Sequence, residues 1–118
     1  MASISYVQDL GGVQGTITVP VAGVGTTLSG GAAITASTVV GIAAAGQVSF
    51  VLPATPAGTR VRFLNVAATA VAATVFPTTA AGKINNGSAG AAVSVAQNKT
   101  AEFINLDGAD NWMALVSA

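Results

Sequence analysis

The chain contains neither cysteine nor histidine. Without cysteine, a disulfide framework and thiolate chemistry are both excluded. Without histidine, the chain lacks the commonest general base, the commonest metal ligand and the usual pH switch. Serine and threonine are abundant, but neither Lys83 nor Lys99 stands in a Ser-x-x-Lys arrangement that would activate a hydroxyl. We therefore expect a protein that is not an enzyme and that uses no cofactor and no metal.

Charge is also scarce. Charged residues make up 7% of the 118 residues, against about 25% in ordinary soluble domains, and four residues of each sign leave a net charge of zero. Such a surface attracts phosphate weakly, so we expect no nucleic-acid partner. It also gives little repulsion between copies of the chain, which favours a protein that works as part of an assembly.

Membrane and export signals are weak. No charge occurs between Asp9 and Arg60, but the most apolar stretch, residues 32–45, consists mainly of Ala, Thr and Val and includes Gly41. A spanning helix needs about 20 mostly apolar residues. The N-terminus lacks the basic region of a signal peptide. We expect synthesis in the cytoplasm and no membrane partner, so a small membrane protein is only a third hypothesis for the function, and an enzyme is the least favoured class.

The sequence contains a series of short segments with the residue pattern of β-strands. Apolar and polar residues alternate along short runs, as at Val48, Phe50 and Leu52, and turn-forming residues separate the runs. The expected strands are residues 16–19, 34–45, 47–52, 59–66, 71–76, 91–96, 100–106 and 112–117. Turn signals spaced by about 8–12 residues predict an all-β fold, either an antiparallel β-sandwich or a small β-barrel. We assign residues 13–118 to this single domain and residues 1–12 to an N-terminal arm or edge strand.

The stretch from Leu52 to Phe76 organises this prediction. Two prolines and Gly58 mark a turn, which is followed by β-rich runs at 59–66 and 71–76 that end at Pro77. We interpret the two runs as a hairpin. Arg60 and Arg62 are two residues apart and so share one strand face.

These arginines have two interpretations, which the sequence leaves open. They are either a solvated strand face, with a cross-strand ion pair to Glu102, or a small cationic patch that contacts a partner. Together with Tyr6, the residues Arg60, Arg62 and Glu102 form our candidate interface.

Two other groups favour structural roles. Asp107 and Asp110 flank a glycine turn, and they offer too few oxygen ligands for a strong calcium site, so we expect them to cap the turn. Trp112 could form a sugar-stacking platform with Tyr6 and Phe76. A chain with so few large residues needs Trp112 in its core, however, and we favour that location.

From Leu52 onward, over rather more than half of its length, the chain resembles a β-rich module of bacteriophage virion proteins, including head-decoration and fibre-type proteins. The residues that carry the resemblance are Leu52-Pro53-Ala54, Ala57-Gly58-Thr59-Arg60-Val61, Asn65, Val75-Phe76-Pro77, Gly82-Lys83-Ile84-Asn85-Asn86-Gly87, Ala91-Ala92-Val93-Ser94-Val95, Lys99-Thr100-Ala101-Glu102-Phe103 and Trp112.

The resemblance implies a capsid decoration (cement) protein. Such a protein is located on the virion, binds the major capsid protein as a symmetric homo-oligomer, with a trimer favoured, and has no catalytic residues. The alternative is a fibre or spike module that binds a host glycan or receptor.

Overall fold

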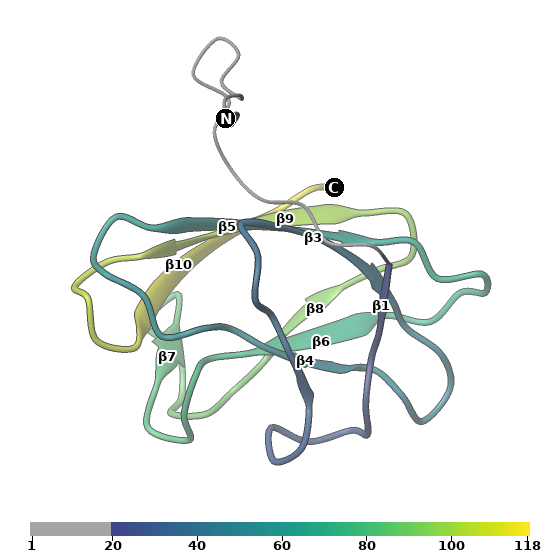
Figure 1. The fold of residues 1–118 in the computed structure, drawn as a ribbon, viewed down its shortest axis with the longest axis horizontal. Helices are drawn as coiled ribbons and strands as arrows, with labels where there is room; N and C mark the ends of the chain where they lie inside the picture. The colour runs from purple at the N-terminus through teal and green to yellow at the C-terminus, as the bar shows by residue number, and fades with distance from the viewer. Residues whose placement is uncertain (1–19) are drawn as a thin grey trace, which may run out of the picture.

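The computed structural model describes residues 20–118, and their regular structure consists of strands without a helix (Figure 1). The strands are β1 (Val21–Ala22), β2 (Ala32–Ala33), β3 (Thr38–Ile42), β4 (Ser49–Val51), β5 (Arg60–Asn65), β6 (Ala73–Phe76), β7 (Lys83–Ile84), β8 (Val93–Val95), β9 (Thr100–Asn105) and β10 (Asn111–Val116). The all-β prediction is therefore confirmed. The expected arm at residues 1–12, Tyr6 within it, and the expected strand at 16–19 lie outside the described residues.

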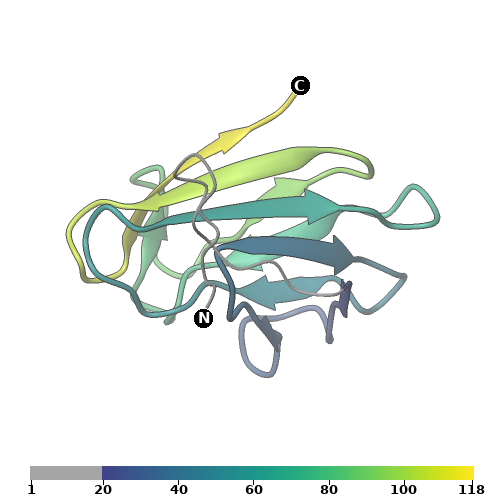
Figure 2. The ribbon, with the colours of Figure 1, turned by 45° about the horizontal axis from the view of Figure 1, so that its top comes forward.

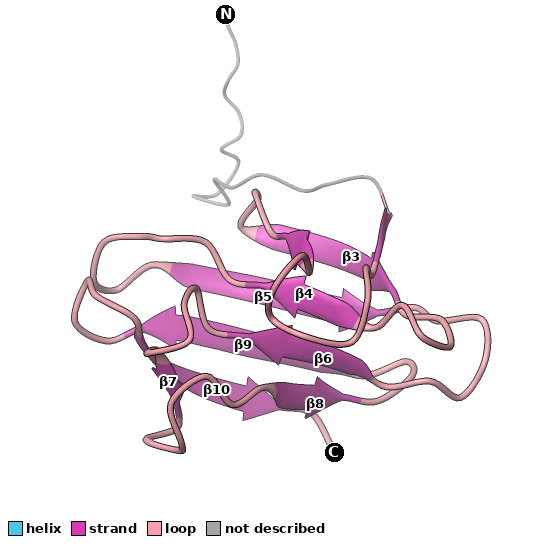
Figure 3. Cartoon of the chain, turned by 90° about the horizontal axis from the view of Figure 1, so that it is seen from below, coloured by secondary structure: helices cyan, strands magenta, loops and turns pink. Residues whose placement is uncertain are grey.

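The strands form two sheets that face each other. One sheet has six strands in the order β1-β3-β5-β9-β10-β7, and the other has four in the order β2-β4-β6-β8. From β1 to β6 the chain alternates between the sheets, so that successive turns of the chain stack in parallel: β1 on β3 on β5, and β2 on β4 on β6. Figure 3 shows β4, β6 and β8 lying over the strands of the larger sheet. This winding is that of a two-faced β-solenoid.

The strands after β6 extend both sheets, but most of them run antiparallel to their neighbours. β8 is antiparallel to β6, β9 is antiparallel to β5, and β10 is antiparallel to β9, while β7 runs parallel to β10. In Figure 2 the neighbouring ribbons of β3, β5, β9 and β10 form one broad layer.

The prediction of an antiparallel sandwich or barrel is wrong. Alternation of apolar and polar residues reports that a strand has one buried face, and it carries no information about the direction of the neighbouring strand. The glycine-rich and proline-rich links between β1 and β6 take the chain across to the opposite sheet. They do not reverse it beside the strand that it has just left.

The hairpin expected within Leu52–Phe76 is wrong for the same reason. β5 belongs to the six-stranded sheet and β6 to the four-stranded sheet, so the two strands do not pair. The Asn65 side chain holds the crossing between them: its Nδ2 donates to Val71 O at 2.9 Å, and its Oδ1 accepts from Ala67 N at 3.1 Å. The loop is a corner of the solenoid.

The core lies between the two sheets, and aromatic rings fill its centre. Trp112, Phe50, Phe63 and Phe103 are fully buried. The rings of Phe50, from the four-stranded sheet, and Phe63, from the six-stranded sheet, meet edge to face with their centroids 4.7 Å apart. Gly41 on β3 lies against these rings, and a Cβ at this position would come within 2.5 Å of Phe63 Cζ. The small residue allows β3 to approach the aromatic centre.

The Asn-Asn-Gly sequence at residues 85–87, which favours a turn, forms one. Asn85 and Asn86 have φ values of 55° and 56°, and Gly87 N donates to Ile84 O at 3.0 Å. Asparagine tolerates this left-handed backbone better than most residues.

Within residues 20–118, no helix has the length and apolar character needed to cross a membrane.

Candidate interaction surface on the six-stranded sheet

The outward side of the six-stranded sheet, which we call the outer face, carries three of the four candidate interface residues. On β5, Val61 and Phe63 point into the core, while Arg60 and Arg62 are exposed on the outer face. On the neighbouring β9, Glu102 also points outward and lies directly opposite Arg62 in the strand register. The structure therefore brings Arg60, Arg62 and Glu102 together, while Tyr6 lies outside the described residues.

The ion pair on this face is weak. Arg60 Nη1 lies 3.6 Å from Glu102 Oε1, and the two side chains are 65% and 28% exposed. Water screens such a pair, which stabilises a fold by at most about 1 kcal/mol. The cross-strand ion pair to Glu102, which belongs to one of the two interpretations of these arginines, is present for Arg60. Arg62 forms no ion pair with any residue of the described range.

Exposed apolar side chains gather on β10 and at the residue that follows β9, beside these charges. Leu115 is 62% exposed, Leu106 is 54% exposed, and Val116 and Met113 are each just above 40%. Leu106, Met113 and Leu115 lie on the outer face, and Val116 lies at the end of the strand. We call these four residues the apolar strip. They are four of the six large hydrophobic residues that the described chain exposes.

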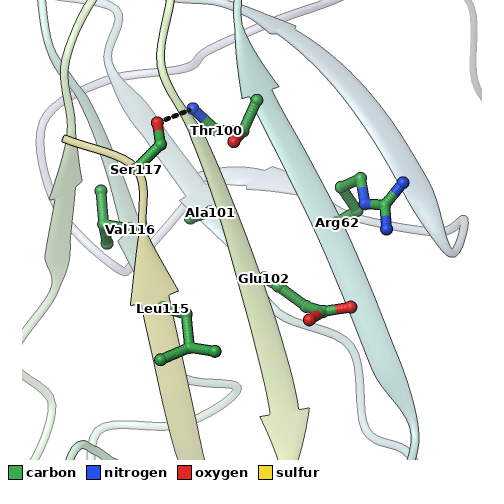
Figure 4. A pocket seen from close by; sticks show the side chains of 7 residues that line it. All are labelled: Arg62, Thr100, Ala101, Glu102, Leu115, Val116 and Ser117. Carbon is green, nitrogen blue, oxygen red and sulfur yellow. Dashed lines mark hydrogen bonds between the residues drawn. The ribbon is translucent and has the colours of Figure 1, made fainter.

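A shallow hollow connects the charges to the apolar strip (Figure 4). It has a volume of about 280 Å³ and spans β5, β9 and β10. Arg62 and Glu102 border it on one side, and Leu115 borders it on the other (Figure 4). Thr100 N donates to Ser117 Oγ at 2.9 Å and so fixes the strand ends that close it. A hollow of this size and mixed character suits a protruding side chain of a partner better than a whole substrate.

The carboxylate of Asp110 is fully engaged in structural hydrogen bonds. Its Oδ1 accepts from Thr78 N at 2.9 Å and Trp112 Nε1 at 2.8 Å, and its Oδ2 accepts from the backbone N and the Oγ1 of Thr79 at 2.7 and 2.8 Å. Burial by itself would raise the pKa of Asp110, but the hydrogen bonds from Trp112, Thr78 and Thr79 outweigh it and lower the pKa. A Cβ on Gly82 would overlap this carboxylate. Asp110 therefore joins β10 to the loop that follows β6.

Asp107 caps the loop between β9 and β10. Asn111 Nδ2 donates to its Oδ2 at 2.5 Å and Ala109 N donates to its Oδ1 at 2.9 Å. The hydrogen bond from Asn111, followed by that from Ala109, lowers the pKa of Asp107. The prediction that both aspartates cap this turn is confirmed for Asp107 and wrong for Asp110, whose carboxylate accepts its hydrogen bonds from the loop that follows β6 and from Trp112. No group of three or more acidic residues that could hold a metal ion occurs in the range 20–118.

Asn65 and Asn105 are both 0% exposed, a burial that was not predicted from the sequence. A signal for them exists in the sequence. Residues 62–66 read Arg-Phe-Leu-Asn-Val and residues 102–106 read Glu-Phe-Ile-Asn-Leu, which is the same order of charged, Phe, aliphatic, Asn and aliphatic residues. The structure places these two segments at the ends of neighbouring strands, β5 and β9.

Trp112 is fully buried, so its expected place in the core is confirmed. Its ring has no free face on which a sugar could stack, and Phe76 is half-buried. The stacking platform that would combine Trp112 with Phe76 and Tyr6 is therefore not formed by the described residues.

Comparison with known proteins adds no relative: no protein-family model, no curated protein and no solved structure matches this chain.

Proposed function

We propose that this chain is a non-enzymatic structural protein of a bacteriophage virion. In this proposal it assembles as a symmetric oligomer, with a trimer favoured, and it decorates and stabilises the capsid by binding the major capsid protein. The observation that carries the proposal is the apolar strip on β10 beside the charged part of the outer face. Exposed large apolar side chains that gather on one face of a protein mark an interaction surface.

The geometry of the sheets favours association through this face over addition of strands at the edges. The edge strands β1, β2 and β7 have two residues each, and the fourth edge strand, β8, has three. Short edges offer few backbone groups for pairing with another chain. The outer face presents Arg62, Glu102 and Leu115 side by side, which allows polar contacts to set the orientation of a partner while apolar contacts supply the affinity.

The test compares two surface variants of the full chain. Leu115→Asp places a charge in the apolar strip, and Val24→Asp is the matched control, since Val24 is 47% exposed in the loop that follows β1. The mass of each protein in solution is measured by light scattering, and its binding is measured on phage capsids that lack it. We expect the unmodified chain and Val24→Asp to form oligomers and bind capsids, and Leu115→Asp to lose at least one of these properties. An unmodified chain that is a monodisperse monomer without affinity for any shell contradicts the proposal.

A second candidate function is a fibre or spike module that binds a host glycan. It is favoured by a separate hollow of about 440 Å³ beside β7 and β10, where Lys83, Asn86, Asp107 and Asn111 present an ammonium, two amides and a carboxylate next to Leu106. Such groups can hydrogen-bond sugar hydroxyls. A glycan array distinguishes the candidates: specific binding that Lys83→Ala abolishes and Lys99→Ala retains supports the glycan-binding function.

A further inference from the structure

The starting observation is an imbalance of charge around Arg62. Every acidic side chain of residues 20–118 already has a partner: Glu102 pairs with Arg60, and Asp107 and Asp110 accept hydrogen bonds within and between loops. Arg62 has no carboxylate partner in that range, although its guanidinium lies on the outer face. The fourth acidic residue of the sequence is Asp9, which precedes the described range.

The surroundings of Arg62 on the side of β3 are suited to a short peptide segment. Thr38 lies opposite Arg62 in the parallel register, and Val40 lies opposite Leu64. Thr38, Val40 and Leu64 are half-buried and point outward. Val39 and Phe63, which alternate with them along the two strands, point into the core. We call Thr38, Val40, Arg62 and Leu64 the β3–β5 patch. It combines one unpaired cation with two aliphatic side chains.

The sequence around Asp9 has the complementary composition. Tyr6, Val7 and Leu10 supply apolar surface, and Asp9 supplies a single negative charge without a neighbouring cation. No other acidic residue precedes β1. A segment with one carboxylate among apolar residues matches a patch with one guanidinium among apolar residues.

The chain enters the sheet beside the patch. Pro20 directly precedes β1, which is the edge strand next to β3, and β3 is next to β5. Two strand spacings amount to about 10 Å. Asp9 lies eleven positions before Pro20, and a chain of that length extends to at most about 40 Å. Asp9 can therefore reach Arg62 of its own molecule, and a tether this short gives an effective concentration in the millimolar range.

We propose that the segment from Tyr6 to Leu10 docks on the β3–β5 patch of the same molecule, with the Asp9 carboxylate on the Arg62 guanidinium and the apolar residues on Val40 and Leu64. The docked segment leaves the apolar strip on β10 open. The segment occupies Arg62, which the proposed function also uses to orient a partner; intramolecular cross-linking tests the docking alone, and capsid binding tests the proposed function alone.

The absence of cysteine makes a cross-linking test specific. Asp9→Cys is combined with Arg62→Cys in the full chain, and the matched control combines Asp9→Cys with Lys83→Cys, because Lys83 is an exposed cation on β7 at the far edge of the sheet. Both proteins are oxidised at low concentration, and disulfides within and between molecules are separated by non-reducing electrophoresis and mapped by mass spectrometry. A disulfide requires Cα atoms within about 7 Å. We expect an intramolecular disulfide in the 9/62 protein and none in the 9/83 control.

A second measurement uses charge reversal and needs no cross-link. Docking slows chymotrypsin cleavage after Tyr6 and Leu10, which is followed by mass spectrometry. We expect Arg62→Asp to accelerate this cleavage and the double variant Asp9→Arg/Arg62→Asp to slow it again. The proposal is overturned if the 9/62 and 9/83 proteins cross-link equally, if the 9/62 disulfide forms only between molecules, or if cleavage is unaffected by Arg62→Asp.

Discussion

Asn65 and Asn105 make equivalent hydrogen bonds at opposite ends of the antiparallel β5–β9 pair. Asn65 N donates to Lys99 O at 3.0 Å, and Asn105 N donates to Thr59 O at 2.9 Å, so that each closes one end of the ladder. In both residues the side-chain Oδ1 accepts backbone N–H from the following turn, and Nδ2 donates to backbone carbonyl oxygens, among them Val95 O at the end of β8 and Thr55 O in the loop before β5. These amides satisfy buried backbone groups where the chain leaves the sheet.

The first prediction concerns this role. Asn105→Asp keeps the size of the side chain but replaces the donor Nδ2 with an oxygen that faces the carbonyl oxygens of Thr55 and Ala109. Loss of buried hydrogen bonds costs about 1–3 kcal/mol for each unsatisfied group, so we expect the free energy of unfolding in urea to fall by about 3 kcal/mol. Asn86→Asp is the control, since Asn86 is exposed in a turn, and we expect a change below about 0.5 kcal/mol. Equal effects of the two variants would show that the buried amide is unimportant.

The second prediction concerns the contact between Gly41 and the aromatic centre. Gly41→Ala places a Cβ about 2.5 Å from Phe63 Cζ, and overpacking of a core costs about 1–3 kcal/mol. We expect a loss of that size in urea unfolding. Phe63→Leu removes the atoms that clash, so in the double variant the added cost of Gly41→Ala should largely disappear. Additive losses in this double-mutant cycle would contradict the proposed contact.

The third prediction concerns acid stability. The folded-state pKa of Asp110 is lowered below its ordinary value of 3.8, so its contribution to stability is present above that pH and is lost as the pH falls through the folded pKa. We expect Asp110→Asn to unfold more easily than the unmodified chain at pH 7, and the difference to shrink below about pH 4. Urea midpoints measured between pH 2 and pH 7 test this. A difference that is independent of pH would assign the effect to packing alone.

The fourth prediction separates stability from association at the arginine pair. The pairing of Arg60 with Glu102 is solvent-exposed, so Arg60→Ala/Arg62→Ala should change the free energy of unfolding by less than about 1 kcal/mol. If the outer face contacts the capsid, the same double variant should bind capsids more weakly than Lys83→Ala, a control on β7. Capsid pull-down and urea unfolding are measured on the same samples. Unchanged capsid binding would remove the two arginines from the proposed contact.

Several local features could be predicted from the sequence because they depend on neighbouring residues. The alternation at Phe50 and Leu52 correctly assigns these residues to the core, and the expected strands at 100–106 and 112–117 correspond to β9 and β10. The turn at Asn85 and Asn86 follows from the backbone preferences of asparagine. The shared face of Arg60 and Arg62 follows from the two-residue period of a strand.

The partners of each strand could not be predicted in this way. The link between β5 and β6 has the composition of a hairpin loop, but Asn65 turns it into a crossing between sheets by binding Val71 O and Ala67 N. The candidate interaction surface likewise combines one feature that could be predicted from the sequence with one that could not. The sequence placed Arg60 and Arg62 on one face, whereas their proximity to Leu115 on β10 depends on which strands are neighbours.

The sequence by itself thus determined an all-β chain, the residues that face its core and the absence of histidine and thiol chemistry, because these depend on composition and on a period of two residues. Only the tertiary structure decided the parallel winding of β1 to β6, the burial of Asn65 and Asn105 at its corners, and the apolar strip beside Arg62. These features depend on hydrogen bonds and contacts between segments far apart in the chain, which are set by the packing of one sheet on the other.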